Sequence, residues 1–173
     1  FEYIDLLPDP RGISCYYAYN HSDSLPSYVS REGDWHHVAV TWTAANSGLT
    51  EIYKDGLKII STMTGKTAPL KKGGALMLGA EQDCYGGCLD KGQGFNGEMD
   101  EVRVWKVARS QDDILKHMRD SEGLDNHPDL AAYWKLNDPI DNGAGTPVAK
   151  DFSGRGNDLV LATMPKYSSQ TIS

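Results

Sequence analysis

The chain has 173 residues, 39% hydrophobic and 24% charged, which fits a single globular domain. Its 17 Lys and Arg against 24 Asp and Glu give a net charge of −7, which argues against nucleic acid as a partner. No apolar run approaches the roughly 20 residues that a membrane span requires, so no span is predicted.

Short runs of alternating apolar and polar residues, separated by Gly, Asp, Asn and Ser, predict an all-β chain of the sandwich type. In the first clear strand, a period of two puts Val38, Val40 and Trp42 on the core face. Asp55-Gly56 is typical of a type I′ turn and predicts a hairpin between its flanking strands. The expected strands are residues 35–42, 50–54, 57–60, 75–78, 98–105, 131–136 and 151–161.

One short helix is predicted near residues 110–120. Ser110 is the expected N-cap, and Asp113 stands at the position of a capping box. A period of 3.6 predicts one buried face made by Ile114, Leu115 and Met118.

The domain is expected to cover residues 1–165, with a polar tail over residues 166–173. Because the chain begins at Phe1 without an initiator Met, we expect a fragment of a larger protein. Asn20 begins an Asn-X-Ser triplet that fits a glycosylation acceptor and favours a secreted, extracellular protein.

Three cysteines are present. Cys84 and Cys88 flank a Tyr-Gly-Gly spacer flexible enough to bring them together, so we expect a local disulfide that shapes a loop. The alternative is three reduced thiols. Cys15 has no assigned partner, and a four-cysteine zinc site is excluded by number.

The loop after residue 78 carries acids at positions that could bind a cation. Glu81 and Asp83 stand two positions apart, so an extended backbone aims both carboxylates to one side, and the Gln82 carbonyl can turn toward the same point. Nearby glycines allow the loop to fold back, which would bring Asp90 and Gln93 to the same point. Such oxygen donors suit Ca²⁺, although a solvated hairpin connection explains the same composition.

A longer series of segments resembles the second half of a pentraxin domain. The order and spacing match at residues 35–42, 55–56, 73–79, 81–83, 86–87, 93, 95 and 97–98. The resemblance implies two adjacent calcium ions bound by Glu81, the Gln82 carbonyl, Asp83, Asp90 and Gln93. It also implies Asp9 as a ligand of the first ion.

Two positions depart from the pentraxin pattern. Pro10 replaces an Asn, so the first calcium ion would have one ligand fewer or a water instead. Ala39 replaces a Cys, so the family's intradomain disulfide is absent. The later segments 96–105, 108–110, 132–134 and 151–158 resemble laminin-G-like modules of large extracellular proteins. Together the resemblances imply an antiparallel jelly-roll β-sandwich.

The resulting hypothesis is a calcium-dependent extracellular recognition module for carbohydrate or phosphate-bearing ligands. Tyr85, at the loop tip, could stack on a ligand group, although an exposed loop tyrosine is the commoner explanation. The alternative is a structural or protein-interaction module of a large extracellular multidomain protein. The oligomeric state is not predicted.

A polysaccharide-active enzyme is a remote alternative. Glu98, Asp100 and Glu101 include the paired carboxylates that glycoside hydrolysis needs, but laminin-G-like modules carry the same Gly-X-X-Asp-Glu-Val pattern as structure. The sequence therefore favours a binding protein that is not an enzyme.

Overall fold

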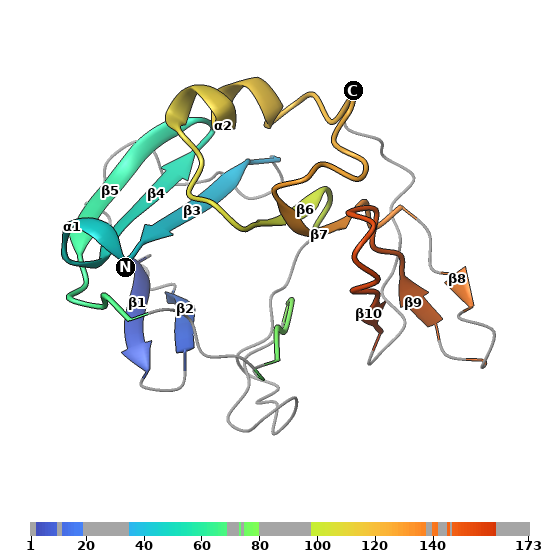
Figure 1. The fold of residues 1–173 in the computed structure, drawn as a ribbon, viewed down its shortest axis with the longest axis horizontal. Coiled ribbons are helices and arrows are strands. Elements are labelled where there is room, and N and C mark those ends of the chain that lie inside the picture. The colour runs from blue at the N-terminus through green and yellow to red at the C-terminus, as the bar shows by residue number, and fades with distance from the viewer. Residues whose placement is uncertain are drawn as a thin grey trace. The chain divides into compact units, whose positions relative to one another are not determined.

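The computed structural model describes residues 3–9, 12–18, 35–68, 73, 75–79, 98–137, 140–141, 145 and 147–161. Contacts divide the chain into two compact units, one comprising residues 1–54 and 58–96 and the other residues 55–57 and 97–173. The elements (Figure 1) are β1 (Tyr3–Asp9), β2 (Gly12–Ala18), β3 (Val38–Thr43), α1 (Ala45–Gly48), β4 (Leu49–Lys54), β5 (Leu57–Met63), β6 (Val102–Trp105), α2 (Gln111–His117), β7 (Leu130–Trp134), β8 (Ile140–Asp141), β9 (Pro147–Ala149) and β10 (Leu159–Val160).

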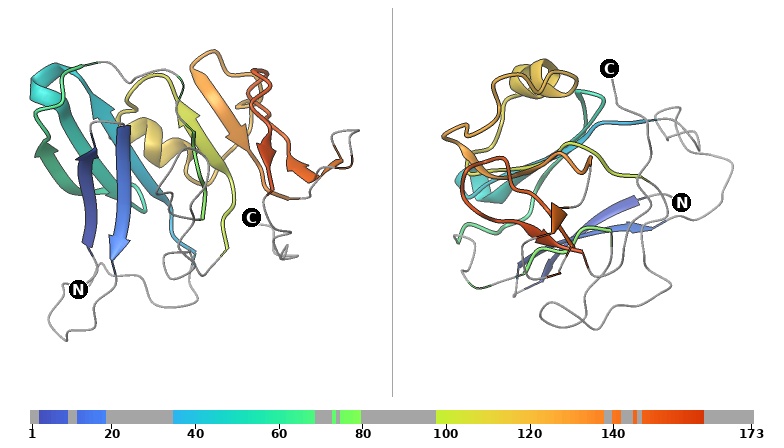
Figure 2. Two further views of the ribbon diagram at one scale, coloured as in Figure 1. Left: turned by 90° about the horizontal axis from the view of Figure 1, so that it is seen from below. Right: turned by 90° about the vertical axis from the view of Figure 1, so that its right-hand side faces the viewer.

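The first unit begins with a hairpin of β1 and β2. The two strands run antiparallel (Figure 2), and their register runs from Tyr3 opposite Ala18 to Asp9 opposite Gly12. Neither strand is among those whose bounds the sequence predicted.

β3, β4 and β5 form a three-stranded sheet in that order. β3 and β4 pair antiparallel from Val38 opposite Lys54 to Thr43 opposite Leu49. At the turn between β4 and β5, Asp55 and Gly56 have φ values of 50° and 77°, the positive angles of a type I′ turn. The predicted hairpin is confirmed.

The predicted core face of β3 is wrong for Val38 and Val40, whereas Trp42 is half-buried. Val38 and Val40 are 57% and 44% exposed, whereas Thr41 on the other face is 7% exposed. β3 is an edge strand of the described sheet. Burial is concentrated instead on β4, where Ile52 and Tyr53 are 1% and 3% exposed.

The second unit has its core around β6 and β7. The two strands pair antiparallel, with a register shift between Val104 and Trp105. The fully buried cluster comprises Leu124, Leu130 and Tyr133, with Trp105 and Phe152 packed against it.

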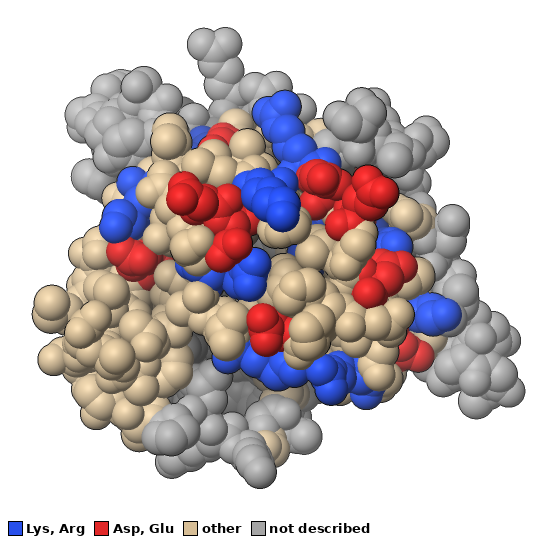
Figure 3. All heavy atoms as spheres, turned by 45° about the horizontal axis from the view of Figure 1, so that its top comes forward, with Lys and Arg blue, Asp and Glu red and all other residues tan. Residues whose placement is uncertain are grey.

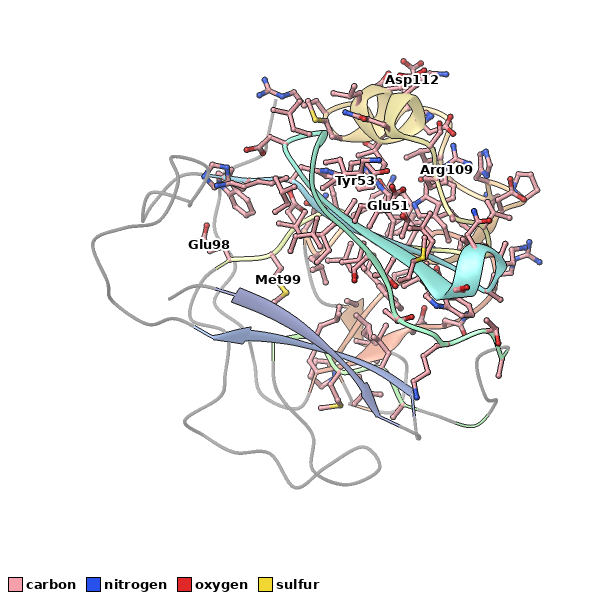
Figure 4. All side chains as sticks on the ribbon, turned by 90° about the vertical axis from the view of Figure 1, so that its left-hand side faces the viewer. Glu51, Tyr53, Glu98, Met99, Arg109 and Asp112 are labelled. Carbon is pink, nitrogen blue, oxygen red and sulfur yellow. The ribbon has the colours of Figure 1, made fainter. Side chains whose placement is uncertain are left out.

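The strand predicted over residues 98–105 is formed only from Val102 onward. Figure 4 shows Glu98 and Met99 pointing to opposite sides of the chain, as in an extended segment. Glu101 then has φ 55°, a left-handed conformation that a strand cannot contain, so the ladder begins one residue later.

Three further differences from the predicted elements are found. Residues 75–78 belong to none of the described strands. The segment 151–161 forms strand only at β10, because residues 151–158 make a turn held by hydrogen bonds. β8, β9 and α1 were not predicted, and α1 contains two residues, Asn46 and Ser47, with positive φ.

α2 confirms the predicted helix and its cap. The Ser110 hydroxyl accepts a hydrogen bond from the Asp113 amide at 3.2 Å and donates one to its carboxylate at 2.7 Å. Ile114 is buried as predicted, but Leu115 is 40% exposed, so the buried face is narrower than expected. No helix of the described residues is long and apolar enough to cross a membrane.

Ser110→Ala is expected to lower the free energy of unfolding by about 1 kcal/mol, because the Asp113 amide loses its acceptor. Urea denaturation measures the change. Ser110→Asp supplies another capping oxygen and should restore most of the loss. Equal stability of the alanine variant and the parent would show that the cap contributes nothing.

The described residues thus form antiparallel sheets with two short helical segments, and the predicted all-β class is confirmed.

Candidate functional site

The predicted calcium ligands fall almost entirely outside the described residues. This holds for Glu81, Gln82, Asp83, Asp90 and Gln93, and also for Tyr85, Cys84, Cys88 and Asn20. Only Asp9 has a described backbone. It ends β1 opposite Gly12, at the turn of the hairpin. The ligand set therefore stays a prediction from the sequence.

The described residues offer no competing metal site. No group of three or more His, Cys, Asp or Glu side chains among them is placed to hold a metal ion. Within the part of the chain that the structure covers, several acids have structural roles that their hydrogen bonds identify.

The carboxylates weighed for catalysis do not form a free pair. Asp100 accepts a hydrogen bond from the Glu101 amide at 2.9 Å, and burial raises the pKa of its carboxyl. The Glu101 carboxylate forms an ion pair with Arg103 and accepts a 2.6 Å hydrogen bond from the Tyr133 hydroxyl. Glu98 is exposed.

Glu101 instead belongs to a structural network. Arg103, whose side chain is 8% exposed, also donates to the His117 carbonyl at 2.7 Å and lies over the Tyr133 ring. Burial, followed by the hydrogen bond to Glu101, raises the pKa of Tyr133 to about 12. The network joins β6, β7 and the end of α2, and its tyrosine stays protonated near neutral pH.

Asp151 organises the segment that follows β9. Its buried carboxylate accepts hydrogen bonds from the amides of Tyr133, Ser153 and Asn157 at 2.8–2.9 Å, and from the Ser153 hydroxyl at 2.8 Å. Burial alone would raise its pKa, but the bonds from Asn157, Ser153 and Tyr133 outweigh it and lower the pKa. The Asp-Phe-Ser-Gly-Arg-Gly-Asn-Asp run was its only indication in the sequence.

A second carboxylate that the sequence did not single out is Glu51, on β4. It accepts from Tyr53 and Lys58 at 2.8 Å and from Ser61 at 3.3 Å, and Figure 4 shows Glu51 beside Tyr53. The Lys58 hydrogen bond is the main cause that lowers the pKa of Glu51. Burial, then Glu51, raises the pKa of Tyr53 to about 12.

The fold resembles that of a solved structure. It is similar to the crystal structure of a Bacteroides ovatus protein for which carbohydrate binding is proposed, with a TM-score of 0.64 and 25% identity over 92% of this chain and 41% of that one. This likeness agrees with the predicted jelly-roll β-sandwich. The model of the pentaxin family matches residues 9–137, and the chain belongs to that family.

Several pentraxins are similar in sequence. Human neuronal pentraxin-2 is 43% identical over 93 residues, or 51% of this chain and 20% of that protein. Human neuronal pentraxin-1 is 40% identical over 79 residues, or 45% of this chain and 18% of that protein. Jeltraxin of Lepidobatrachus laevis is 32% identical over 93 residues, or 54% of this chain and 41% of that protein. The chain thus spans about a fifth of the neuronal pentraxins it matches.

Proposed function

We propose that the chain is a calcium-binding recognition module of the pentraxin type that binds carbohydrate or phosphate-bearing ligands through calcium. One observation carries the proposal: the family match extends from Asp9 to residue 137 and so includes every predicted ligand residue. The proposal rests on the identity of these residues, and it uses no geometry of the loop.

The donor set suits a hard cation. Four carboxylates, one backbone carbonyl and one amide oxygen are proposed as ligands, and Ca²⁺ binds six to eight such oxygens without His or Cys. Bound calcium would supply a positive charge for the oxygens of an anionic or vicinal-hydroxyl ligand. Because Pro10 has no side-chain amide, we expect one ion to bind fully and a second only with a substitute ligand.

Two further observations support ligand binding over catalysis. The Bacteroides ovatus protein with a similar fold has carbohydrate binding proposed for it. In this chain, Glu101 is held by Arg103 and Tyr133 and does not form a free acid pair with Asp100. We therefore propose a binding protein that is not an enzyme, with Tyr85 as an additional ligand contact.

The remaining parts of the proposal concern the environment of the chain. We place it in the extracellular space, as a domain over residues 1–165, with a Cys84–Cys88 disulfide and glycosylation at Asn20. Proposed partners are carbohydrate, phosphate-bearing ligands or other extracellular domains.

A second candidate function is a structural or protein-interaction module of a large extracellular protein. It is favoured by the resemblance of residues 96–105, 108–110, 132–134 and 151–158 to laminin-G-like modules of large extracellular proteins. In that role, calcium would be structural or absent.

Calcium is expected to raise the thermal stability of the chain. If calcium binds only the native state, its presence at 100 times the dissociation constant stabilises by about 2.7 kcal/mol. Differential scanning calorimetry with calcium and with chelator measures the shift. Asp83→Asn should abolish most of it, because a neutral amide replaces a carboxylate ligand.

Asp112→Asn is the matched control, since it removes the same charge from an exposed residue of α2. It should keep the full calcium shift. A parent with no shift would overturn the calcium proposal. A shift without binding to a glycan and phosphoester array would favour the structural module, and turnover of a polysaccharide would contradict the assignment as a binding protein.

A further inference from the structure

Two basic side chains of the second unit converge on one backbone carbonyl. Lys106 directly follows β6, and Arg155 lies in the turn that Asp151 organises. The Lys106 ammonium donates a hydrogen bond to the Pro128 carbonyl, and Arg155 Nη2 donates to the same oxygen at 3.0 Å. Both side chains belong to exposed residues.

The charges of these two side chains are not neutralised within the described part of the chain. There, neither forms an ion pair with a carboxylate, and their shared hydrogen-bond acceptor is a neutral carbonyl. Two other cations of the unit are paired with carboxylates, Arg109 with Asp113 at 3.2 Å and Lys135 with Asp125 at 3.0 Å. Lys106 and Arg155 thus concentrate two positive charges at one point.

The backbone holds all three segments in place. The Lys106 amide donates to the Asp129 carbonyl at 2.9 Å, and the Leu130 amide donates to the His127 carbonyl at 3.1 Å. The Arg155 amide donates to the Ser153 hydroxyl at 3.3 Å, and that hydroxyl is bound to Asp151. Chain segments before and after β7 are therefore fixed before any ligand arrives.

Because both cationic groups lie within hydrogen-bonding distance of one oxygen, they are within roughly 6 Å of each other. At that separation they repel each other, and the carbonyl dipole offsets only part of the repulsion. An anionic ester group with several acceptor oxygens would offset the repulsion and accept hydrogen bonds from both side chains. Figure 3 shows acidic and basic side chains intermixed on the face of the molecule that it draws.

We propose that Lys106 and Arg155 form an anion site for a sulfate or phosphate ester, the Pro128 carbonyl setting their spacing. The site uses none of the predicted calcium ligands and needs no calcium. Sulfate and phosphate esters share the chemistry that the pair recognises, a tetrahedral anionic group with several acceptor oxygens, and either ester could be carried by an extracellular glycan.

The test measures binding of dextran sulfate to the 173-residue chain in the presence of a calcium chelator. Unsulfated dextran is the reference polymer. Lys106→Gln/Arg155→Gln should weaken binding on the order of tenfold, because two local charges are lost. The dependence of log affinity on log salt should fall by about two, one for each contact. Circular dichroism and the single variant Lys106→Gln separate lost binding from lost folding, since the single variant should show about half the effect on the logarithm of affinity.

The control variant Lys66→Gln/Lys116→Gln removes the same net charge from two exposed residues. It should leave binding within about twofold of the parent, and equal weakening by both double variants would overturn the site. Inorganic sulfate and inorganic phosphate then serve as competitors. Stronger competition by one identifies the ester, whereas competition by neither overturns the proposal. Because chelator is present throughout, failure here leaves the calcium proposal intact, and failure of the calcium shift leaves this site intact.

Discussion

Asp151→Ala is expected to lower the free energy of unfolding by about 3–5 kcal/mol, because several buried donors lose their acceptor together, and this is the largest effect of any single change proposed for the described residues. The substitution removes both oxygens that accept from Tyr133, Ser153 and Asn157. Three amides would then lose their acceptor, and the turn over residues 151–158 would lose its organising charge. Urea denaturation, followed by tryptophan fluorescence, measures the loss.

Asp151→Asn separates charge from shape. An amide has one acceptor oxygen, and its NH₂ group would face donors already aimed at the carboxylate, so we expect a loss of about 2–3 kcal/mol. Glu122→Gln, at an exposed acid, should change stability by less than about 0.5 kcal/mol. A loss at Asp151 no larger than at Glu122 would contradict the assigned role.

The pH dependence has a defined sign. The folded-state pKa of Asp151 lies below its ordinary value of 3.8, so the unfolded chain takes up the proton more readily. The contribution of Asp151 is therefore fully present above pH 3.8 and is lost as the pH falls through the folded-state pKa. The stability difference between the parent and Asp151→Asn should shrink over that acidic interval and stay constant above it.

Gly56→Ala is expected to cost about 2–3 kcal/mol for two separate reasons. Gly56 has φ 77°, which costs an L side chain roughly 1–2 kcal/mol. A Cβ atom built there would also lie 2.2 Å from Leu115 Cδ2 and 2.9 Å from Leu115 Cγ, so the leucine would have to move. Equilibrium unfolding in urea measures the total.

Gly123→Ala isolates the backbone contribution, because Gly123 has φ 73° and a Cβ atom added there would meet no described heavy atom within 4 Å. The difference between the two alanine variants should measure the clash with Leu115. In a Leu115→Ala background, Gly56→Ala should cost only about as much as Gly123→Ala does in the parent. Equal costs at Gly56 and Gly123 in the parent would show that the clash relaxes freely.

Features set by neighbouring residues were predictable from the sequence. The positive φ values at Asp55-Gly56 follow from the conformational freedom of these two residue types, and the hairpin follows from the turn. The Ser110 cap likewise depends on an amide only three residues away. Such features need no knowledge of the rest of the fold.

Features set by distant residues were not predictable. The position at which β6 begins depends on the positive φ of Glu101, whose carboxylate is held by Tyr133, a residue 32 positions later. Val38 and Val40 alternate like core residues, but their burial depends on which distant residues pack against that face of the sheet. Alternation identifies two faces of a strand without showing which one becomes buried.

The candidate site also has one part that the sequence predicts and one part that depends on distant residues. The donor residues could be selected from the sequence because Ca²⁺ prefers oxygen ligands and because the segments resemble a family to which the chain is now shown to belong. Their mutual geometry depends on the folding of a glycine-rich loop, which residue types alone do not determine. By contrast, the pair formed by Lys106 and Arg155 has no sequence pattern, since the two residues lie far apart in the chain and meet only at the Pro128 carbonyl.

The turn between β4 and β5 also has a consequence for how the chain folds. Residues 55–57 belong to the second unit, although most of the strand residues on both sides belong to the first. The Gln111 side chain donates a hydrogen bond to the Gly56 carbonyl at 2.9 Å, although the two residues lie 55 positions apart. The second unit therefore includes a segment that is synthesised well before the rest of that unit. During synthesis, this hydrogen bond can form only after α2 has been made. A polypeptide starting at residue 97 would lack the contact between α2 and the turn. The turn is therefore expected to reach its final stability only after α2 has formed.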